Sequence, residues 1–143
     1  MAFKDMDFNL TEGQRALRDT VRKFGAEVVR PAGEKLDKLA DPADVIARGS
    51  ALRDVYRTYH ELGLHRRIIP RALGGMWEDV DHMSQFIILE ELGYADSGLG
   101  ISLGASGMPF SFAAMFPAPK MMEMAQAYAA DTKGELIGCW AIT

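Results

Sequence analysis

The sequence predicts an all-α fold, a helical bundle domain of about five to six helices that ends in a single strand. Apolar residues recur at intervals of three and four from Leu17 to Tyr128, which is the period of one face of a helix. Capping residues, glycines and prolines divide the chain into pieces of helical length. Only from Leu136 onward does a continuous β-compatible apolar run appear. We therefore expect a helical domain over residues 1–134 and a second structural unit that begins at 135–143.

The composition excludes several classes of protein. The 143 residues carry a net charge of −4, whereas a general nucleic-acid binder usually has a basic excess. The first ten residues lack the apolar core of a signal peptide, and no apolar run approaches the length of a membrane span. Cys139 is the only cysteine, so no internal disulfide can form, and we expect it to be a small core residue. These features favour a cytoplasmic protein.

The first two helical segments are marked by their ends. Thr11 followed by Gln14 is a capping-box pattern, and Pro31 predicts that this first helix stops near Val29. Asp41 and Pro42 are suited to begin the second helix. Gly49 and Ser50 can kink or divide it, and Gly63 is a natural stop.

The third and fourth helices contain the stretch on which the fold depends, residues 86–104. Asp79 can cap the third helix, and Gly93 predicts its end. Its run Phe86, Ile87, Ile88, Leu89 is apolar on every side, which predicts a buried helix. Asp96 or Ser97 can cap the fourth helix, which should reach about Phe116 with a bend at Pro109.

Glycines interrupt the apolar residues of the fourth helix. Each costs a helix about 1 kcal/mol relative to alanine, so Gly98, Gly100, Gly104 and Gly107 suggest that a backbone or a flat ligand comes close. The alternation also allows a strand. A dinucleotide-binding turn is rejected because the spacing differs and no βαβ pattern surrounds it.

A fifth helix is expected over 120–130, with methionines 121, 122 and 124 filling the core. The strand follows the turn at Gly134, and an unpaired apolar strand is an aggregation hazard. A helical domain that ends within a strand suggests the N-terminal part of a larger protein.

The residues alone supply no complete active site. His60 and His65 are five apart, not the three or four that share a helix face, and no zinc motif is present. No serine has a nucleophile-elbow context. Glu90 and Glu91 point in directions about 100° apart and are expected at a solvated edge. The basic cluster from His65 to Arg71 is expected at a solvated rim, with an anionic ligand as the alternative.

Four motifs in order resemble the acyl-CoA dehydrogenase family. They are ELGL (Glu61–Leu64), IPRALGG (Ile69–Gly75), EELGYADSGLGISLG (Glu90–Gly104) and GELIGCWAIT (Gly134–Thr143). The resemblance covers essentially the whole chain. It matches the N-terminal α-helical domain, over residues 1–134, and the first strand of a middle β-domain that is incomplete here, over 135–143.

The resemblance implies FAD as cofactor and acyl-CoA as substrate, desaturated between Cα and Cβ by a carboxylate base and hydride transfer to the flavin. Trp140, Ile142 and Thr143 match the flavin-contacting segment, and the helix that faces the acyl chain is matched by Gly100, Ile101, Leu103 and Gly104. It also implies an electron-transfer flavoprotein or similar acceptor and a homo-oligomeric assembly of the intact enzyme. The catalytic carboxylate would lie in a C-terminal domain absent from these residues, so this chain alone is predicted to be inactive and not to hold FAD tightly.

Two other hypotheses remain. A flavin-dependent oxidase or monooxygenase of the same fold would share these motifs but act on a different substrate. A non-catalytic helical partner subunit would use Leu136–Thr143 to complete the sheet of another protein by strand addition.

Overall fold

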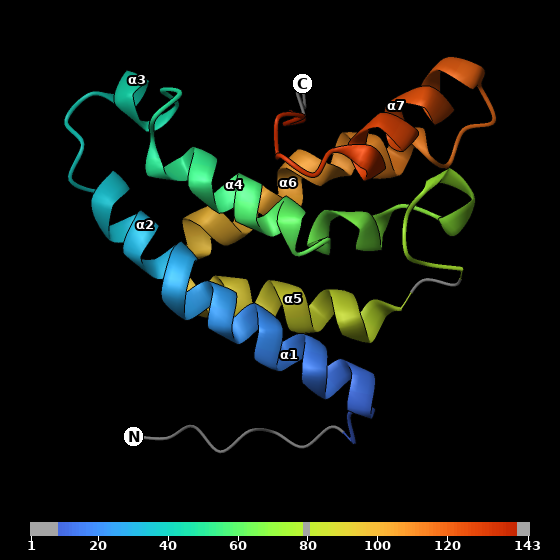
Figure 1. Ribbon diagram of the computed structural model, residues 1–143, viewed down its shortest axis with the longest axis horizontal. Helices are drawn as coiled ribbons and strands as arrows, with labels where there is room; N and C mark the ends of the chain where they lie inside the picture. The colour runs from blue at the N-terminus through green and yellow to red at the C-terminus, as the bar shows by residue number, and fades with distance from the viewer. Residues whose placement is uncertain (1–8, 79–80, 140–143) are drawn as a thin grey trace.

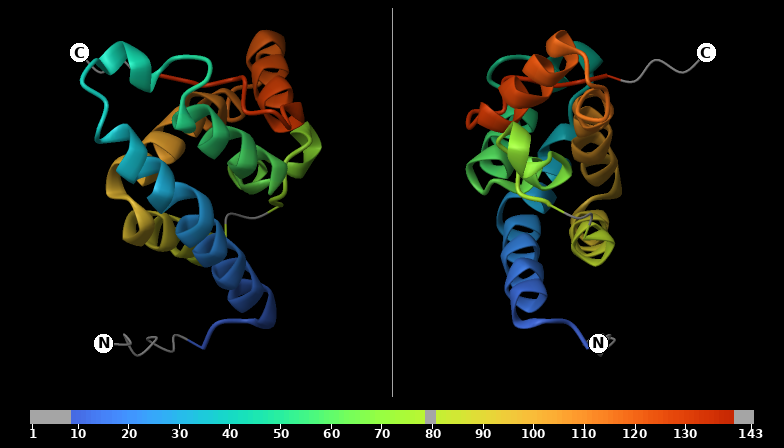
Figure 2. Two further views of the ribbon diagram at one scale, coloured as in Figure 1. Left: turned by 60° about the vertical axis from the view of Figure 1, so that its left-hand side comes forward. Right: turned by 90° about the vertical axis from the view of Figure 1, so that its right-hand side faces the viewer.

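The computed structural model describes residues 9–78 and 81–139, and in this part the protein is a two-layer helical bundle. One layer holds α1 (Glu12–Phe24), α2 (Arg30–Leu36), the single turn α3 (Pro42–Val45) and α4 (Ala51–Glu61). The other holds α5 (His82–Ala95) and α6 (Ser97–Ala113). Figure 2 shows the layers edge-on in its right-hand view, with α7 (Pro119–Ala130) across one end of α6. The all-α prediction is confirmed.

The first helix begins as predicted and continues further than predicted. The Gln14 amide donates to Thr11 Oγ1 at 3.2 Å, and the Thr11 amide donates to Gln14 Oε1 at 3.0 Å, which completes the capping box. The predicted stop near Val29 is wrong. A π-helical segment, η1 (Gly25–Val29), joins α1 directly to α2 and forms one long rod (Figure 1). Its wider turn places Pro31 in the first turn of α2, where a missing N–H is tolerated.

The second predicted helix is divided in two. Asp41 caps α3 and Ser50 caps α4, each through a side-chain oxygen that accepts a backbone N–H. Gly63 follows α4 with φ +68°, the left-handed conformation that glycine adopts without strain. The chain then makes two 3₁₀ turns, η2 (Leu64–Ile68) and η3 (Arg71–Leu73).

The helices α5 and α6 differ from the sequence predictions in several respects. Asp81 caps α5, whereas the expected cap, Asp79, lies outside the described residues. Gly93 does not end α5, which runs on to Ala95. The run 86–89 is not buried on every side, because Ile87 and Ile88 face the core while Phe86 and Leu89 are 57% and 54% exposed. The glycine-rich stretch is helical throughout, with Pro109 inside α6, so the strand alternative is wrong.

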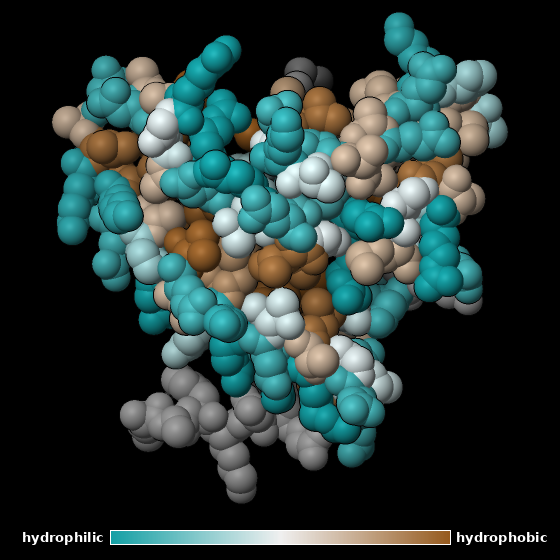
Figure 3. Space-filling model, in the orientation of Figure 1, coloured by the Kyte–Doolittle hydropathy of each residue, from teal (hydrophilic) through white to brown (hydrophobic). Residues whose placement is uncertain are grey.

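Two clusters of buried residues hold the bundle together. The larger joins α1, η1, α4, α5 and α6 around Val21, Val55, Leu92 and Leu103. The smaller fastens α7 to α6, η2 and η3 around Ile69, Phe110 and Tyr128. The methionines at 121, 122 and 124 are 37–42% exposed, so the core role predicted for them is wrong. In the view of Figure 3 the surface is mostly hydrophilic, with apolar side chains gathered in the seam between α4 and the α1–α5 pair.

The described part of the predicted strand differs from the prediction, and its remaining residues, 140–143, lie outside the described residues. Residues 136–139 adopt no strand, and among the described residues the only β-type pairing is an isolated bridge between Pro70 and Trp77. A β-strand is stabilised by backbone hydrogen bonds to a neighbouring strand, and the described part of the chain contains no strand that could pair with it. Cys139 is exposed rather than buried in a core.

Glu91 also departs from its predicted place at a solvated edge. It is 5% exposed and accepts two hydrogen bonds from Arg22 of α1, Nε to Oε2 at 3.0 Å and Nη2 to Oε1 at 2.7 Å. The pair ties α1 to α5.

Replacing Arg22 with methionine is expected to lower the free energy of unfolding by roughly 1–3 kcal/mol, because a buried carboxylate loses its charged donors. Arg71→Met is the matched control, since Arg71 and Glu78 form a pair at 3.0 Å with both side chains exposed, and such pairs contribute about 0–1 kcal/mol. Urea denaturation of both variants measures the difference. If both variants lost the same free energy of unfolding, the buried ion pair would contribute no more to stability than the exposed one.

Candidate functional site

The junction of α5 and α6 brings the two helices into close contact. Asp96 stands alone between them, and its Oδ1 accepts the Leu99 amide at 2.8 Å. A Cβ on Gly100 would lie 3.2 Å from both the Gly93 nitrogen and the Leu92 carbonyl carbon. Gly100 therefore allows backbone-to-backbone packing of α6 on α5, which explains this glycine without a ligand.

The four residues predicted to face the acyl chain lie on different sides of α6. Gly100 and Leu103 are turned into the bundle, and Leu103 is 1% exposed in the larger core cluster. Ile101 is 71% exposed, and Gly104 is partly exposed, with its would-be Cβ 3.5 Å from Leu89 Cδ2. Acyl contact by these four residues stays a prediction. Ile101 and Gly104 are the two that are accessible from outside the bundle.

Large apolar side chains surround these two open positions. We call this surface the α5–α6 face and define it by Phe86, Leu89, Ile101, Gly104 and Met108, of which the four with side chains are 44–71% exposed. The sequence of α6 contains no charged residue. Contiguous exposed apolar patches mark ligand grooves or interfaces, so we take the α5–α6 face as the apolar wall of a candidate ligand site.

The segment that leads to the predicted flavin residues touches the same helix. The Gly138 amide donates to the Ser106 carbonyl at 3.2 Å. A Cβ on Gly138 would lie 2.5 Å from that oxygen and 3.0 Å from Pro109 Cγ, so only glycine allows this approach. The three predicted flavin residues, Trp140, Ile142 and Thr143, lie outside the described residues, and their assignment stays a prediction.

A buried histidine pair is the feature that sequence reasoning missed. The spacing of five argued against a shared helix face, but Gly63 ends α4 between the two residues and the chain turns back. The rings of His60 and His65 are stacked with centroids 4.0 Å apart and planes 6° apart. Both meet the Tyr128 ring at nearly right angles, with centroids 5.3 and 5.4 Å away. The predicted solvated rim is therefore wrong for His65, which is fully buried.

The hydrogen bonds of the pair fix its tautomers. His60 Nδ1 donates to the Asp131 carbonyl at 2.7 Å, and His65 Nε2 donates to the Ala129 carbonyl at 3.3 Å. Since a carbonyl can only accept, His60 Nδ1 and His65 Nε2 each carry a proton. Burial, followed by the neighbouring His60, lowers the pKa of His65 to about 4 despite the opposing hydrogen bond to Ala129. The neutral His65 ring, stacked on His60, thus anchors the C-terminal end of α7.

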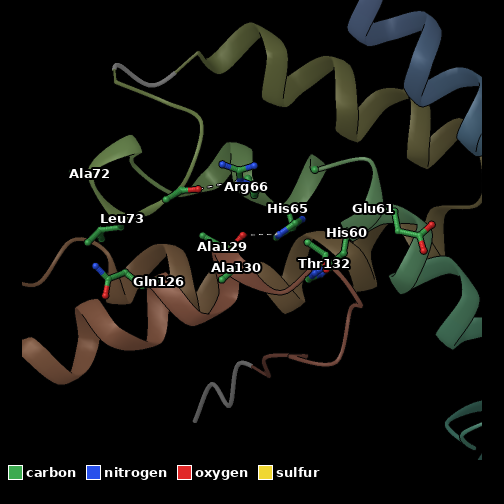
Figure 4. A pocket seen from close by; sticks show the side chains of 12 residues that line it. His60, Glu61, His65, Arg66, Ala72, Leu73, Gln126, Ala129, Ala130 and Thr132 are labelled. Carbon is green, nitrogen blue, oxygen red and sulfur yellow. Dashed lines mark hydrogen bonds between the residues drawn. The ribbon is translucent and has the colours of Figure 1, made fainter.

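A pocket of about 530 Å³ opens beside this pair, between η2, η3 and α7 (Figure 4). Arg66 lies at its rim, where its Nε donates to the Gly74 carbonyl at 3.0 Å. The unpartnered nitrogens, His60 Nε2 and His65 Nδ1, are sealed from solvent, so an occupant of the pocket would not reach them. Over residues 9–78 and 81–139, no three His, Cys, Asp or Glu side chains gather as metal ligands would. The pair is a structural anchor.

The chain matches one family of proteins over most of its length. Residues 11–116 match the family described as acyl-CoA dehydrogenase, N-terminal domain. None of the described helices combines the length and apolar character that crossing a membrane demands.

Several solved structures with the same fold are structures of nitroalkane oxidase. One, in complex with the competitive inhibitor spermine, superposes with a TM-score of 0.75 and 25% identity over 93% of this chain and 30% of that one. Another, an active-site variant crystallised with 1-nitrooctane, has a TM-score of 0.70 and 24% identity over 94% of this chain and 29% of that one. A further structure describes nitroalkane oxidase as a flavoprotein. The chain therefore spans about three-tenths of the length of these proteins.

Proposed function

Because the chain belongs to the acyl-CoA dehydrogenase family, we propose that it forms the helical, acyl-binding part of an FAD-dependent enzyme that desaturates an acyl-CoA thioester. The observation that carries this proposal is the α5–α6 face. An acyl chain needs an apolar wall without charges, and α6, which contains no charged residue, provides one. Each methylene buried against such a wall stabilises the complex by about 0.8 kcal/mol.

The chain's own residues have two roles in this proposal. Ile101 and Leu89 exclude water from the acyl chain, and Gly104 leaves room for it between them. Trp140, Ile142 and Thr143 would hold the flavin ring, and FAD, when bound, accepts the hydride that leaves Cβ. Gly138 brings the segment that carries these residues against α6.

The catalytic base is proposed to come from outside this chain. Glu91 is engaged with Arg22 between α1 and α5 and is not available to a substrate. We propose that the 143 residues alone neither hold FAD tightly nor turn over acyl-CoA, and that the whole enzyme is a homo-oligomer that passes electrons to an electron-transfer flavoprotein or similar acceptor.

A second candidate is a flavin oxidase that acts on nitroalkanes. It is favoured by the similarity to nitroalkane oxidase structures at 24–25% identity. An apolar wall would serve an alkyl chain that ends in a nitro group as well as one that ends in a thioester, so the α5–α6 face does not separate the two substrates.

Anaerobic mixing of each substrate with the flavin-bearing protein, purified from its host, separates the candidates. Loss of the visible flavin absorbance with acyl-CoA, and not with nitroalkanes, is the result expected for a dehydrogenase. Loss with nitroalkanes, followed by oxygen consumption in air, would favour the oxidase. A flavin that neither substrate reduces would contradict both proposals.

Replacing Gly104 with leucine is expected to shift the preferred acyl chain toward shorter lengths, because the new side chain fills the space beside Leu89. Each methylene excluded from the wall should cost about 0.8 kcal/mol, or roughly fourfold in kcat/KM. The measurement is the kcat/KM profile over a series of saturated acyl-CoA substrates. Gly13→Leu is the control, since Gly13 lies on α1 with open space around it. An unchanged profile in Gly104→Leu would remove this position from the acyl site.

A further inference from the structure

The residues between α7 and the predicted flavin segment form a turn organised by one carboxylate. Asp131 directly follows α7, and its Oδ1 accepts the Lys133 amide at 2.9 Å. Its Oδ2 accepts the Leu136 amide at 2.8 Å. Gly134 completes the turn with φ +68°. Burial alone would raise the pKa of the Asp131 carboxyl, but the amides of Leu136 and Lys133 and the nearby His60 lower it below its usual value. The carboxylate is therefore ionised near neutral pH and holds both amides.

The turn is fastened to the end of α4. His60 Nδ1 donates to the Asp131 carbonyl and lies 3.6 Å from Asp131 Oδ2. Gly134 rests on the α4 backbone, where a Cβ would lie 2.7 Å from the Tyr56 carbonyl oxygen. His60 is held in turn by its stack with His65 and by Tyr128. The position of Asp131 is thus fixed by buried His60 and by the packing of the adjoining Gly134 on α4.

The chain that leaves the turn is held again only a few residues later. The Gly138 amide donates to the Ser106 carbonyl on α6, so the segment is attached at Leu136 and at Gly138. The five residues that follow Gly138, up to Thr143, can span at most about 17 Å when fully extended. Anything that the last residues contact must therefore lie within about that distance of α6.

We infer that Asp131, held in place by His60, is a positioning residue for the cofactor site: its carboxylate fixes where the segment that carries Trp140, Ile142 and Thr143 leaves the helical domain. This inference rests on the proposed function, because it takes these three residues as the ones that hold the flavin. Asp131 itself touches neither cofactor nor substrate. It acts through the two amides that it accepts and through the attachment at Gly138 that they make possible.

The first test is amide hydrogen exchange of the protein purified from its host, compared with its Asp131→Ala variant. Loss of two charge-assisted hydrogen bonds should speed exchange at Lys133, Leu136 and Gly138 by about tenfold or more, with little change in α1 and α5. Asp131→Asn keeps one acceptor oxygen and should fall between the two. Asp41→Ala is the matched control, because Asp41 accepts an exposed amide at 2.8 Å at the start of α3, and it should loosen only that turn.

The second test is the rate of flavin release from the same proteins, followed by flavin fluorescence. Asp131→Ala should release flavin about tenfold faster, Asp131→Asn by less, and Asp41→Ala at the wild-type rate. Unchanged exchange in residues 133–138 would overturn the inference. So would faster exchange with an unchanged rate of flavin release, since Asp131 would then be a local structural residue only. An intact wild-type enzyme that carries no flavin when purified from its host would overturn the proposed function, and this inference with it, before any variant is made.

Discussion

Replacing Gly134 with alanine is expected to lower the free energy of unfolding by roughly 2–4 kcal/mol. Part of this loss, about 1 kcal/mol, is the cost of a side chain in the left-handed conformation, since Gly134 has φ +68°. The larger part is steric, because the new Cβ would lie 2.7 Å from the carbonyl carbon and oxygen of Tyr56 and 2.9 Å from the Arg57 nitrogen. These are backbone atoms of α4, which cannot rotate away, and overpacking of this kind costs about 1–3 kcal/mol.

Gly63 supplies a matched control for this prediction. It has the same φ of +68°, but no atom lies within 4 Å of its would-be Cβ. Gly63→Ala should therefore show the conformational cost alone, about 1 kcal/mol. Urea denaturation of both variants at neutral pH measures the difference between them. A loss in Gly134→Ala no larger than in Gly63→Ala would mean that the turn does not rest on α4 in solution.

Acidification from about pH 7 to pH 4 is expected to lower the free energy of unfolding by roughly 3 kcal/mol through His65. The pKa of His65 is about 4 in the folded protein, against an ordinary value of 6.5. Between these two pH values His65 is protonated in the unfolded chain but not in the folded protein, so the free energy of unfolding falls as the pH falls. At pH values well above 6.5 both states are neutral at this residue, so it contributes no slope there. Asp131, whose pKa is lowered, adds a further loss only below its ordinary value.

Urea denaturation across this pH range checks the prediction, with His65→Phe as the test variant. Phenylalanine keeps a flat ring against His60 and Tyr128 but does not titrate, so its profile should be flatter than that of the wild type. The variant also loses the hydrogen bond to Ala129, at a cost of about 1 kcal/mol near neutral pH. His82→Gln is the control, because it removes a histidine that is exposed at the start of α5. An unchanged slope in His65→Phe would assign the pH dependence to other groups.

Helix beginnings and the fold class could be predicted from the sequence because their signals are local. The capping residues Thr11, Asp41 and Asp96 accept hydrogen bonds from amides two or three positions ahead. Such a contact depends on the immediate neighbours and survives in almost any tertiary context. The turn at Gly63 is of the same kind, since a positive φ is a property of one residue.

Burial could not be predicted as well, because it depends on partners that are distant in the sequence. Glu91 is buried because Arg22 lies 69 positions away and yet within 2.7 Å. His65 is buried because α7, more than fifty residues later, closes over it. In the opposite direction, Phe86 and Leu89 look like core residues but lie on a side of α5 that no described element covers.

The site residues predicted on α6 stay a prediction, and the structure shows what surrounds two of its glycines. The glycines of α6 pointed to close approach, and the structure divides them between two causes. Gly100 packs on α5, whereas Gly104 lies at the open surface beside Leu89. The spacing of the two glycines in the sequence cannot separate these cases, because positions 100 and 104 are four apart and lie nearly on one line along the helix. The path of α5 across that line decides which glycine is covered.

The π-helical segment bears on how this chain should be aligned with its relatives. Counted along the first rod, the buried side chains stand at 17, 21, 24, 29 and 32, and the step of five is one that an α-helix does not produce. An α-helix without this widened turn would present the same inward face with one residue fewer. An ungapped alignment with such a relative would be correct up to Phe24. After Val29 it would pair residues whose side chains point about 100° apart around the helix, so that exposed positions of α2 would be compared with core positions. A single-residue gap opened within Gly25–Val29 restores the correspondence.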